Sequence, residues 1–249
     1  MSGAATPPVP PVLCIRELTT GYGTHPVLHD VTLQIALGEW CVVLGPNGSG
    51  KSTLLYAAAG LLAPRSGRIE LSGVPLENAA AAKRTLGYGC APERLPGLLT
   101  GRQCLQVYAA AKGLKEIDRG VLVLAEALGL SGRLERYVDT YSLGMRQKLA
   151  VLLALVGAPR LIVLDEAFNG LDPSSAALLK HHLRRLVDEH RAAVLLATHA
   201  LEIAERYADR LALLLEGRIR HVWDRAQLAA QRAAGKPLEE LLAAAAGAP

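Results

Sequence analysis

The stretch GPNGSGKST, residues 45–53, restricts the fold of this chain more than any other segment. It follows the apolar run EWCVVL, which is typical of a buried strand, and it opens KSTLLYAAAGLL, whose pattern predicts a helix. The positions that fit the phosphate-loop pattern G-x-x-x-x-G-K-[ST] are Gly45, Gly50, Lys51 and Ser52. The segment therefore joins a strand to a helix through a glycine-rich loop.

A loop of this kind is suited to the phosphates of a nucleoside triphosphate. Glycines let backbone N–H groups turn toward phosphate oxygens, and the N-terminus of the following helix directs free donors at the same anion. Lys51 would neutralise charge on the β- and γ-phosphates, and the Ser52 hydroxyl would ligate Mg²⁺. The strand before and the helix after favour this interpretation over an ordinary glycine-rich turn. The predicted ATP contacts are Gly45, Pro46, Asn47, Gly48, Ser49, Gly50, Lys51, Ser52 and Thr53.

Length and composition allow one large folded domain and argue against some functions. The chain has 249 residues, of which 51% are hydrophobic, so it can form a large buried core. Its net charge of +4 is too small to indicate a polybasic surface that binds nucleic acid. Residues 1–11 lack the charged and apolar regions of a signal peptide and predict a flexible arm. The longest apolar stretch, residues 149–158, is far shorter than the roughly 20 residues of a membrane span. Work at a membrane would therefore require docking onto another chain.

The remaining pattern alternates strands and helices, which predicts an α/β fold with a mainly parallel sheet. Strand-like segments lie at 12–20, 31–37, 39–44, 67–73, 160–165, 192–198 and 210–217. Helical patterns lie at 51–62, 101–114, 117–130, 145–156, 174–190 and 200–208. The middle of the chain thus predicts a helical lobe that interrupts the sheet, and the alanine-rich tail after Trp223 predicts short helices.

The segment LIVLDE, residues 161–166, is an apolar strand that ends in two carboxylates. The carboxyl end of a strand in an open parallel sheet is where ligands bind. Asp165 would hold Mg²⁺, directly or through water, and Glu166 would polarise the attacking water as a general base. A solvated acidic pair at a strand end is the common alternative, and the phosphate loop favours the functional interpretation.

The segment YSLGMRQKLAVLLALV begins a second helix that bears on function. Ser142 is a good N-cap residue, and the apolar positions Leu149, Leu152, Leu153 and Val156 fall on one helical face. On its own this pattern indicates an ordinary capped core helix. Its serine and glycine, placed in the chain between the phosphate loop and the acidic strand, also fit a second clamp for an anion.

These motifs, taken together and in this order, resemble the nucleotide-binding subunit of an ATP-binding cassette (ABC) transporter, from about Val12 to His221. GPNGSGKST resembles the Walker A motif, LIVLDE the Walker B motif and YSLGM the signature motif. NGLD, Asn169 to Asp172, resembles the D-loop, and TH at His199 resembles the switch histidine. Any one of these matches is modest evidence, whereas the whole ordered set is highly specific.

The resemblance implies a fold and a division of the chain. The fold is a P-loop NTPase core with a mainly parallel sheet, an N-terminal antiparallel β subdomain and an inserted α-helical subdomain. The ABC ATPase domain is expected over 12–222, with the helical subdomain at about 93–156. Residues 1–11 would be the flexible arm and 223–249 a short helical tail.

The resemblance also implies a mechanism with ATP and Mg²⁺. Two such domains face each other head to tail, so that the Walker A motif of one and the signature of the other share each ATP. Asp172 would couple the two sites, and His199 would hold the γ-phosphate and the attacking water beside Glu166 and Lys51. His199 read alone would be a helix-capping residue. The signature residues that would act in trans are Ser142, Leu143, Gly144 and Met145.

Two further positions take their meaning from the family. Tyr22 matches the aromatic residue that stacks on adenine, whereas by sequence alone it is equally a turn tyrosine. Glu93 occupies the Q-loop position, where the family usually has glutamine; it retains an oxygen for Mg²⁺ but adds a charge. A solvated loop carboxylate is the alternative for Glu93.

The signature departs from the usual LSGGQ in a way that bears on the subfamily. Leu143 replaces a glycine and Met145 replaces the glutamine, and forms such as YSLGMRQKL resemble the ABC-2-type exporters. That subfamily commonly pairs one such chain with a separate permease chain. We expect the apolar segment LPGLLTG, residues 95–101, and its neighbouring helices to receive the permease.

The sequence therefore predicts an ATP-hydrolysing subunit that powers export through a separate permease. It would lie peripherally on the cytoplasmic side of the inner membrane, as a homodimer or beside a second ATP-binding subunit. The alternative is a soluble ABC ATPase acting on nucleic acid or the ribosome. The interval between Thr53 and Ser142 carries no coiled coil or zinc insertion and the chain has one cassette, which disfavours that class. A nucleotide-gated module without turnover is disfavoured because the predicted catalytic set is complete.

Overall fold

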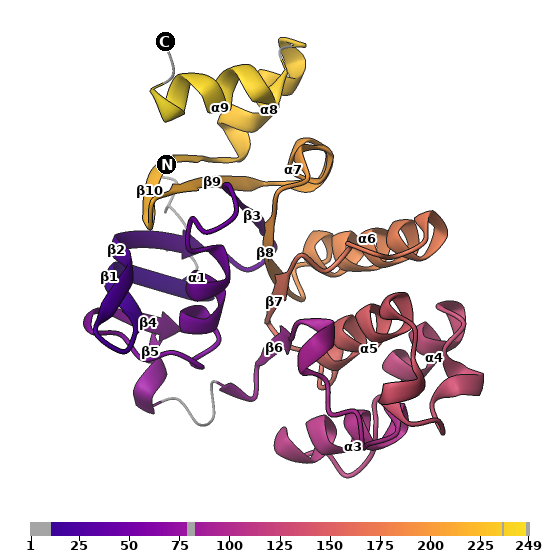
Figure 1. The fold of residues 1–249 in the computed structure, drawn as a ribbon. Coiled ribbons are helices and arrows are strands. Elements are labelled where there is room, and N and C mark those ends of the chain that lie inside the picture. The colour runs from indigo at the N-terminus through magenta and orange to yellow at the C-terminus, as the bar shows by residue number, and fades with distance from the viewer. Residues whose placement is uncertain (1–10, 79–82, 236, 248–249) are drawn as a thin grey trace, which may run out of the picture.

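Two β-sheets and a lobe of helices make up the part of the chain that the computed structural model describes, residues 11–78, 83–235 and 237–247 (Figure 1). The smaller sheet is antiparallel, with the strand order β2-β1-β4-β5. Its strands are β1 (Leu13–Tyr22), β2 (His25–Ile35), β4 (Ser66–Leu71) and β5 (Val74–Pro75). This sheet is the expected N-terminal antiparallel subdomain. The predicted flexible arm, apart from Pro11, lies outside the described residues.

The larger sheet has six strands in the order β10-β9-β3-β8-β7-β6. Neighbouring strands are parallel except β10 and β9, so the prediction of a mainly parallel sheet is confirmed. The bounds are β3 (Trp40–Leu44), β6 (Leu86–Gly89), β7 (Leu161–Asp165), β8 (Ala193–Thr198), β9 (Arg210–Leu215) and β10 (Arg218–Trp223).

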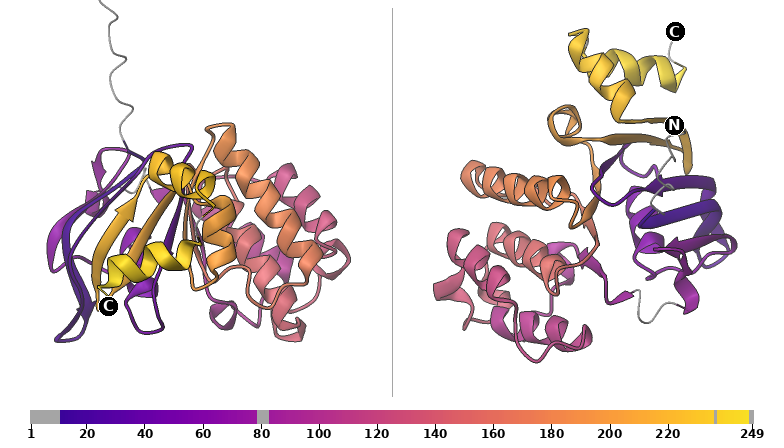
Figure 2. Two further views of the ribbon diagram at one scale, coloured as in Figure 1. Left: turned by 90° about the horizontal axis from the view of Figure 1, so that it is seen from above. Right: turned by 180° about the vertical axis from the view of Figure 1, so that it is seen from behind.

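The described helices fall into three groups, which are seen apart in Figure 1 and in the right-hand view of Figure 2. The helix at residues 51–58 lies at the phosphate loop, the helices between residues 101 and 155 form a lobe beside β6, and the remaining described helices lie over the larger sheet and its β9–β10 edge. The α-helices are α1 (Lys51–Ala58), α3 (Gly101–Ala111), α4 (Arg119–Ala127), α5 (Leu143–Leu155), α6 (Pro173–Asp188), α7 (Leu201–Tyr207), α8 (Arg225–Ala233) and α9 (Leu238–Ala246). The shorter 3₁₀ turns are η1 (Leu76–Asn78), η2 (Pro92–Arg94), η3 (Ser131–Arg133) and η4 (Val138–Thr140).

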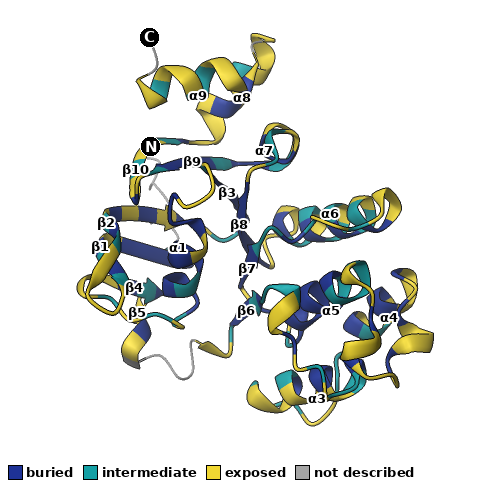
Figure 3. Ribbon diagram, in the orientation of Figure 1, coloured by how far each residue is buried: buried dark blue, intermediate teal, exposed yellow. Residues whose placement is uncertain are grey.

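The larger sheet separates two hydrophobic cores, because successive side chains of a strand point to opposite faces. In β3, Trp40 and Val42 join the core under the helical lobe, whereas Cys41 and Val43 join the core shared with α1 and the smaller sheet. All four side chains are fully buried, as the dark core of Figure 3 shows. The phosphate loop therefore leaves a strand that is fixed on both faces.

Some elements differ from the sequence-based expectations. Helix α1 ends at Ala58, short of the predicted Leu62, because Gly60 adopts a left-handed φ of 70° that ends the helix. The sequence-based prediction does not include β5, β6 or β10, and β1 continues to Tyr22, beyond the predicted end at Thr20. None of the helices within 11–78, 83–235 and 237–247 has the length and apolarity needed to span a bilayer.

Candidate nucleotide site

The phosphate loop needs glycine at the positions where the sequence has it. Gly48 and Gly50 have φ angles of 80° and 104°, in the region that favours glycine. A Cβ atom on Gly45 would lie 2.2 Å from the carbonyl oxygen of Leu214 on the neighbouring strand β9. The loop thus leaves β3, passes close to β9 and turns into α1 without room for larger side chains.

The N-terminus of α1 differs from those of four other helices. Side chains cap α3, α5, α6 and α8, through Thr100, Ser142, Asp172 and Asp224. Helix α1 has Gly50 at its N-cap position and no side-chain cap. Its first-turn N–H groups, together with the positive end of the helix dipole, are therefore left for a ligand.

A hollow of about 300 Å³ lies at this helix end, a volume suited to a small molecule. Its lining combines the phosphate loop with the acidic end of β7, as the sequence predicted, and adds one residue of β2. The lining residues are Val27, Asn47, Gly48, Gly50, Lys51, Ser52, Thr53, Asp165 and Glu166. Val27 carried no signal in the sequence, since it is one apolar residue of an ordinary strand.

Lys51 places a positive charge inside the loop. Its side chain is buried, and Nζ donates hydrogen bonds to the carbonyl oxygens of Gly45 at 2.8 Å and Pro46 at 3.0 Å. These two bonds hold the ammonium group against the loop backbone. An ammonium held so close to uncapped N–H groups makes the hollow a site for an anion.

Asp165 faces the loop from the end of β7. Burial raises the pKa of its carboxyl group, and a hydrogen bond with Ser52 opposes that shift. A hydroxyl and a carboxylate in contact are oxygen donors of the kind that Mg²⁺ accepts together with phosphate oxygens and water. Across the described ranges, no three His, Cys, Asp or Glu side chains gather to hold a metal ion.

Glu166 is held by several neighbours on the next strand and loop. Its backbone adopts a left-handed φ of 45° while its N–H donates to Ala197 O at 2.9 Å. Oε2 accepts from the Thr198 hydroxyl at 3.0 Å and from Asn169 Nδ2 at 3.2 Å. Oε1 lies 2.9 Å from Nδ1 of His199. A non-glycine residue in this conformation is strained, and such strain is often found at functional sites.

The contacts of Glu166 with Thr198 and Asn169 went unrecognised in the sequence. The sequence assigns Asn169 to the start of the D-loop and Thr198 to the end of a strand and to the TH pair, and neither assignment predicts a contact with Glu166. The position of Thr198 directly before His199 is the sequence feature that could have indicated its contact with Glu166. Glu166 and His199, each predicted separately as catalytic, lie together.

The signature segment lies at the start of α5, away from the hollow. The Ser142 hydroxyl accepts from the backbone N–H of Met145 at 3.2 Å and caps the helix. Leu143 is exposed, and both Leu143 and Gly144 lie against Gly170 of the D-loop segment. Within one chain, the described lining of the hollow therefore includes no signature residue.

Asp172 caps α6 and links it to α5. Its Oδ1 accepts from the backbone N–H of Ser175 at 2.8 Å, and its Oδ2 pairs with Lys148 Nζ at 3.1 Å. Hydrogen bonds from the hydroxyls of Ser174 and Ser175 and from Lys148 hold the pKa of Asp172 well below its usual range. Asp172 thus remains ionised and fixes the D-loop segment to the signature helix of the same chain.

Tyr22 and Glu93 lie outside the described lining of the hollow. Tyr22 ends β1 with half of its surface exposed, and Glu93 is exposed in η2. The neighbouring Arg94 stacks 4.9 Å from the ring centre of Tyr56. Burial raises the pKa of Asp165, and the charge of Arg94 makes a small contribution in the opposite direction. The roles predicted for Tyr22 and Glu93 therefore stay predictions.

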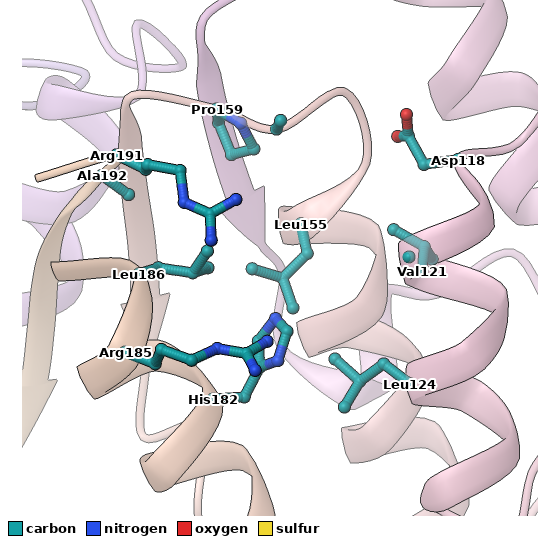
Figure 4. Close-up of a pocket in the computed structure, with 12 residues that line it drawn as sticks. Asp118, Val121, Leu124, Leu155, Pro159, His182, Arg185, Leu186, Arg191 and Ala192 are labelled. Carbon is teal, nitrogen blue, oxygen red and sulfur yellow. The ribbon is translucent and has the colours of Figure 1, made fainter. Parts of the chain in front are cut away.

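Figure 4 shows a second hollow, of about 320 Å³, between α4, α5 and α6. Its walls are mainly apolar, with His182, Arg185 and Arg191 on one side and Asp118 on the other. Both arginines form ion pairs with Glu189, which offsets their charge. Among described residues it shares no lining with the nucleotide hollow, and it lacks a phosphate loop.

Uncapped N–H groups, a buried ammonium and two carboxylates in one hollow define a P-loop nucleotide site. The chain belongs to the ABC transporter family, whose model matches residues 28–169. It is an ATP-binding subunit of that family and hydrolyses ATP.

Relatives and a solved structure agree with this assignment. The Nod factor export ATP-binding protein I of Rhizobium meliloti is 35% identical over 82% of this chain and 62% of its own length. The sulfate/thiosulfate import ATP-binding protein CysA of Nocardia farcinica is 36% identical over 85% of this chain and 64% of its own. The chain thus spans less than two thirds of both relatives. A solved ATP-binding subunit of an ABC transporter is 31% identical, with a TM-score of 0.81, over 94% of this chain and 99% of that one.

Proposed function

We propose that this chain powers export through a separate membrane permease, with Glu166 as the general base of ATP hydrolysis. The observation that carries the proposal is the contact of Glu166 with His199 at the edge of a hollow lined by the phosphate loop. Glu166 would accept a proton from the attacking water, and His199 would hold that water and the γ-phosphate. Lys51 would stabilise the charge that develops on the phosphates.

Mg²⁺ would be held by Ser52 and Asp165, with ATP oxygens completing its shell. The donor set fits the ion, because Mg²⁺ is usually bound through one or two carboxylates plus phosphates and water. Bound there, the ion would neutralise phosphate charge. Burial of Asp165 disfavours an uncompensated carboxylate, which also favours a cation beside it.

The complete site would require a second chain. Ser142, Leu143, Gly144 and Met145 lie at one end of α5, and Ser142 and Leu143 are exposed. A partner whose signature faced this chain's phosphate loop would supply the donors that the hollow lacks, and its own loop would face this chain's signature. This head-to-tail pairing, as a homodimer or with a second ATP-binding subunit, is part of the proposal.

The permease would dock on the face formed by the loop 95–101 and α3. Leu98 is 84% exposed and Val107 of α3 is also exposed, so the loop and the helix both present large apolar side chains to solvent. A hollow of about 500 Å³ lies between α3, β6 and the end of α1, with Lys83 and Arg84 at its rim. Docking here would hold the chain peripherally at the cytoplasmic side of the inner membrane. The exporter-like signature favours export over import.

A variant pull-down tests this proposal. Tagged Glu166→Gln chain is incubated with ATP, Mg²⁺ and detergent-solubilised membranes, and its partners are identified by mass spectrometry. We expect a multi-span permease to co-purify, and ATP turnover to fall by about 100-fold or more because the base is lost. The matched control is Glu202→Gln, the same change in an exposed ion pair with Arg206 on α7. Ribosomal or DNA-bound proteins without a membrane chain would support the non-transport class instead.

A further inference from the structure

Tyr22 stands beside a tight turn at the tip of the smaller sheet. It is the last residue of β1 and pairs with His25, the first residue of β2, so that Gly23 and Thr24 alone connect the two strands. Gly23 adopts a left-handed φ of 51°. Half of the Tyr22 surface is exposed, so side-chain packing does little to fix the turn. The orientation of this turn, and of Tyr22 beside it, must therefore depend on other contacts.

Arg65 makes those contacts with a single guanidinium group. Nη1 donates to the carbonyl oxygen of Thr24 at 3.1 Å. Nη2 donates to the carbonyl oxygen of Gly23 at 2.7 Å and lies 3.5 Å from that of Tyr22. The planar guanidinium has five N–H donors in a fixed fork, which suits several acceptors at once. One side chain therefore holds three consecutive carbonyl groups of the turn.

The backbone around Arg65 is itself fixed to β1. The Arg65 N–H donates to Thr19 O at 2.9 Å, and the next residue, Ser66, pairs with Thr19 in the β1–β4 ladder. The buried Thr20 hydroxyl donates to Ala63 O at 2.7 Å. This segment leads from α1 to β4, so it connects the helix at the phosphate loop to the turn beside Tyr22.

We infer that Arg65 is a positioning residue that orients Tyr22 toward the adenine of ATP bound at the phosphate loop. The inference rests on the proposed role of Tyr22 in stacking on the base. Stacking depends on the angle of the ring face, and a turn that is ordered in advance loses less conformational entropy when the nucleotide binds. Arg65 contacts only the backbone of the turn and acts through Tyr22.

A double-mutant cycle measures this coupling. Dissociation constants of Tyr22→Ala, Arg65→Ala and the double variant are measured by calorimetry with Mg²⁺ and a non-hydrolysable ATP analogue. The same series is repeated with inorganic tripolyphosphate, which has no base. We expect Tyr22→Ala and Arg65→Ala each to weaken the analogue by about two- to tenfold, the range of an aromatic stacking contact. Neither variant should change the affinity for tripolyphosphate. In the Tyr22→Ala background, Arg65→Ala should not weaken binding of the analogue any further.

Matched variants separate positioning from general effects of charge and folding. Arg68→Ala removes the same charge three residues along the chain, where the side chain pairs with Glu70, and it should leave analogue affinity unchanged. Arg65→Lys should be intermediate, because one ammonium group cannot span the three carbonyls. Thermal unfolding without nucleotide identifies any variant that fails to fold.

Three results would overturn the inference. If Arg65→Ala weakened the binding of the analogue and of tripolyphosphate equally, the effect would be a general electrostatic or structural one. A further loss from Arg65→Ala in the Tyr22→Ala background would mean that Arg65 acts independently of Tyr22. An unchanged analogue affinity in Tyr22→Ala would remove the stacking role and the inference with it, while a binding loss in Lys51→Ala would still support the phosphate site.

Discussion

At the scale of single residues, the site depends on how one carboxylate is held. Glu166 lies in a strained backbone conformation, and its two carboxylate oxygens contact three side chains. The hydroxyl of Thr198 is the most buried of these partners. A hydrogen bond from a buried hydroxyl to the carboxylate fixes its orientation. Thr198 should therefore influence catalysis without contacting the substrate.

We expect Thr198→Val to lower the turnover number by about tenfold, because a misplaced general base loses part of its contribution. ATP affinity should change little, since Thr198 does not line the nucleotide hollow. Steady-state kinetics and equilibrium nucleotide binding check the two halves of this prediction. Thr198→Ser keeps the hydroxyl and should retain most of the activity. A valine variant as active as the wild type would contradict the positioning role.

Lys112 makes stability depend on pH. Burial lowers its pKa from 10.5 to about 8, although Nζ also donates to Val156 O. The unfolded chain then binds more protons than the folded chain between about pH 8 and 10.5, so the free energy of unfolding should rise with pH across that window. Lys112→Met should flatten this rise in urea unfolding curves at pH 7–10. The exposed Lys115→Met should keep it, and an unchanged slope in Lys112→Met would contradict the assignment.

At the scale of elements, helix caps fix where the lobe begins. Thr100 and Gln103 form a capping box at the start of α3, with each side chain bonded to the other's backbone N–H. We expect Thr100→Ala to lower the free energy of unfolding by about 1 kcal/mol, measured by urea denaturation. Thr100→Ser retains the hydroxyl and should recover most of that loss. Equal destabilisation by both substitutions would indicate lost packing of the threonine methyl group.

The hydrophobic periodicity of the sequence predicts most helices and most of the buried parallel strands, but it does not predict β6 or β10. Strand β6 reads LGYG, which indicates a turn, yet its glycines are required by packing. A Cβ on Gly87 would collide with Ala154 O of α5, and one on Gly89 would lie 2.8 Å from a methyl group of Leu164. Strand β10 reads RIRHVW, a polar edge strand that pairs with β9 on one side. Both strands follow from tertiary contacts that local sequence does not encode.

The site was predictable to the extent that it is built from contiguous motifs. The phosphate loop and the β7 carboxylates were found because each is a short run with a known chemical use. The contact of Glu166 with Thr198 depends instead on strand register, in which Asp165 of β7 lies opposite Ala197 of β8. That register is set by core packing across the sheet, so no segment of the sequence reveals it.

At the scale of the whole molecule, the two halves of the proposed site, the phosphate loop and the signature, lie apart within one chain. The phosphate loop and Glu166 lie together at the hollow, whereas Ser142 stands exposed at the start of α5. The Lys148–Asp172 ion pair joins the signature helix to the D-loop segment. A second chain placed head to tail would therefore meet a signature and a D-loop that are already fixed to each other.

This arrangement predicts that two inactive variants complement each other. Lys51→Ala lacks a working phosphate loop but keeps its signature, and Ser142→Arg lacks a working signature but keeps its loop. In a head-to-tail pair, the loop of the Ser142→Arg chain meets the intact signature of the Lys51→Ala chain and forms one complete site. We expect each variant alone to have little ATPase activity and an equal mixture to regain a substantial part of it. Light scattering should show ATP-dependent species of twice 26.4 kDa in the mixture. A mixture no more active than its components would mean that each chain completes its own site, and the head-to-tail proposal would fall.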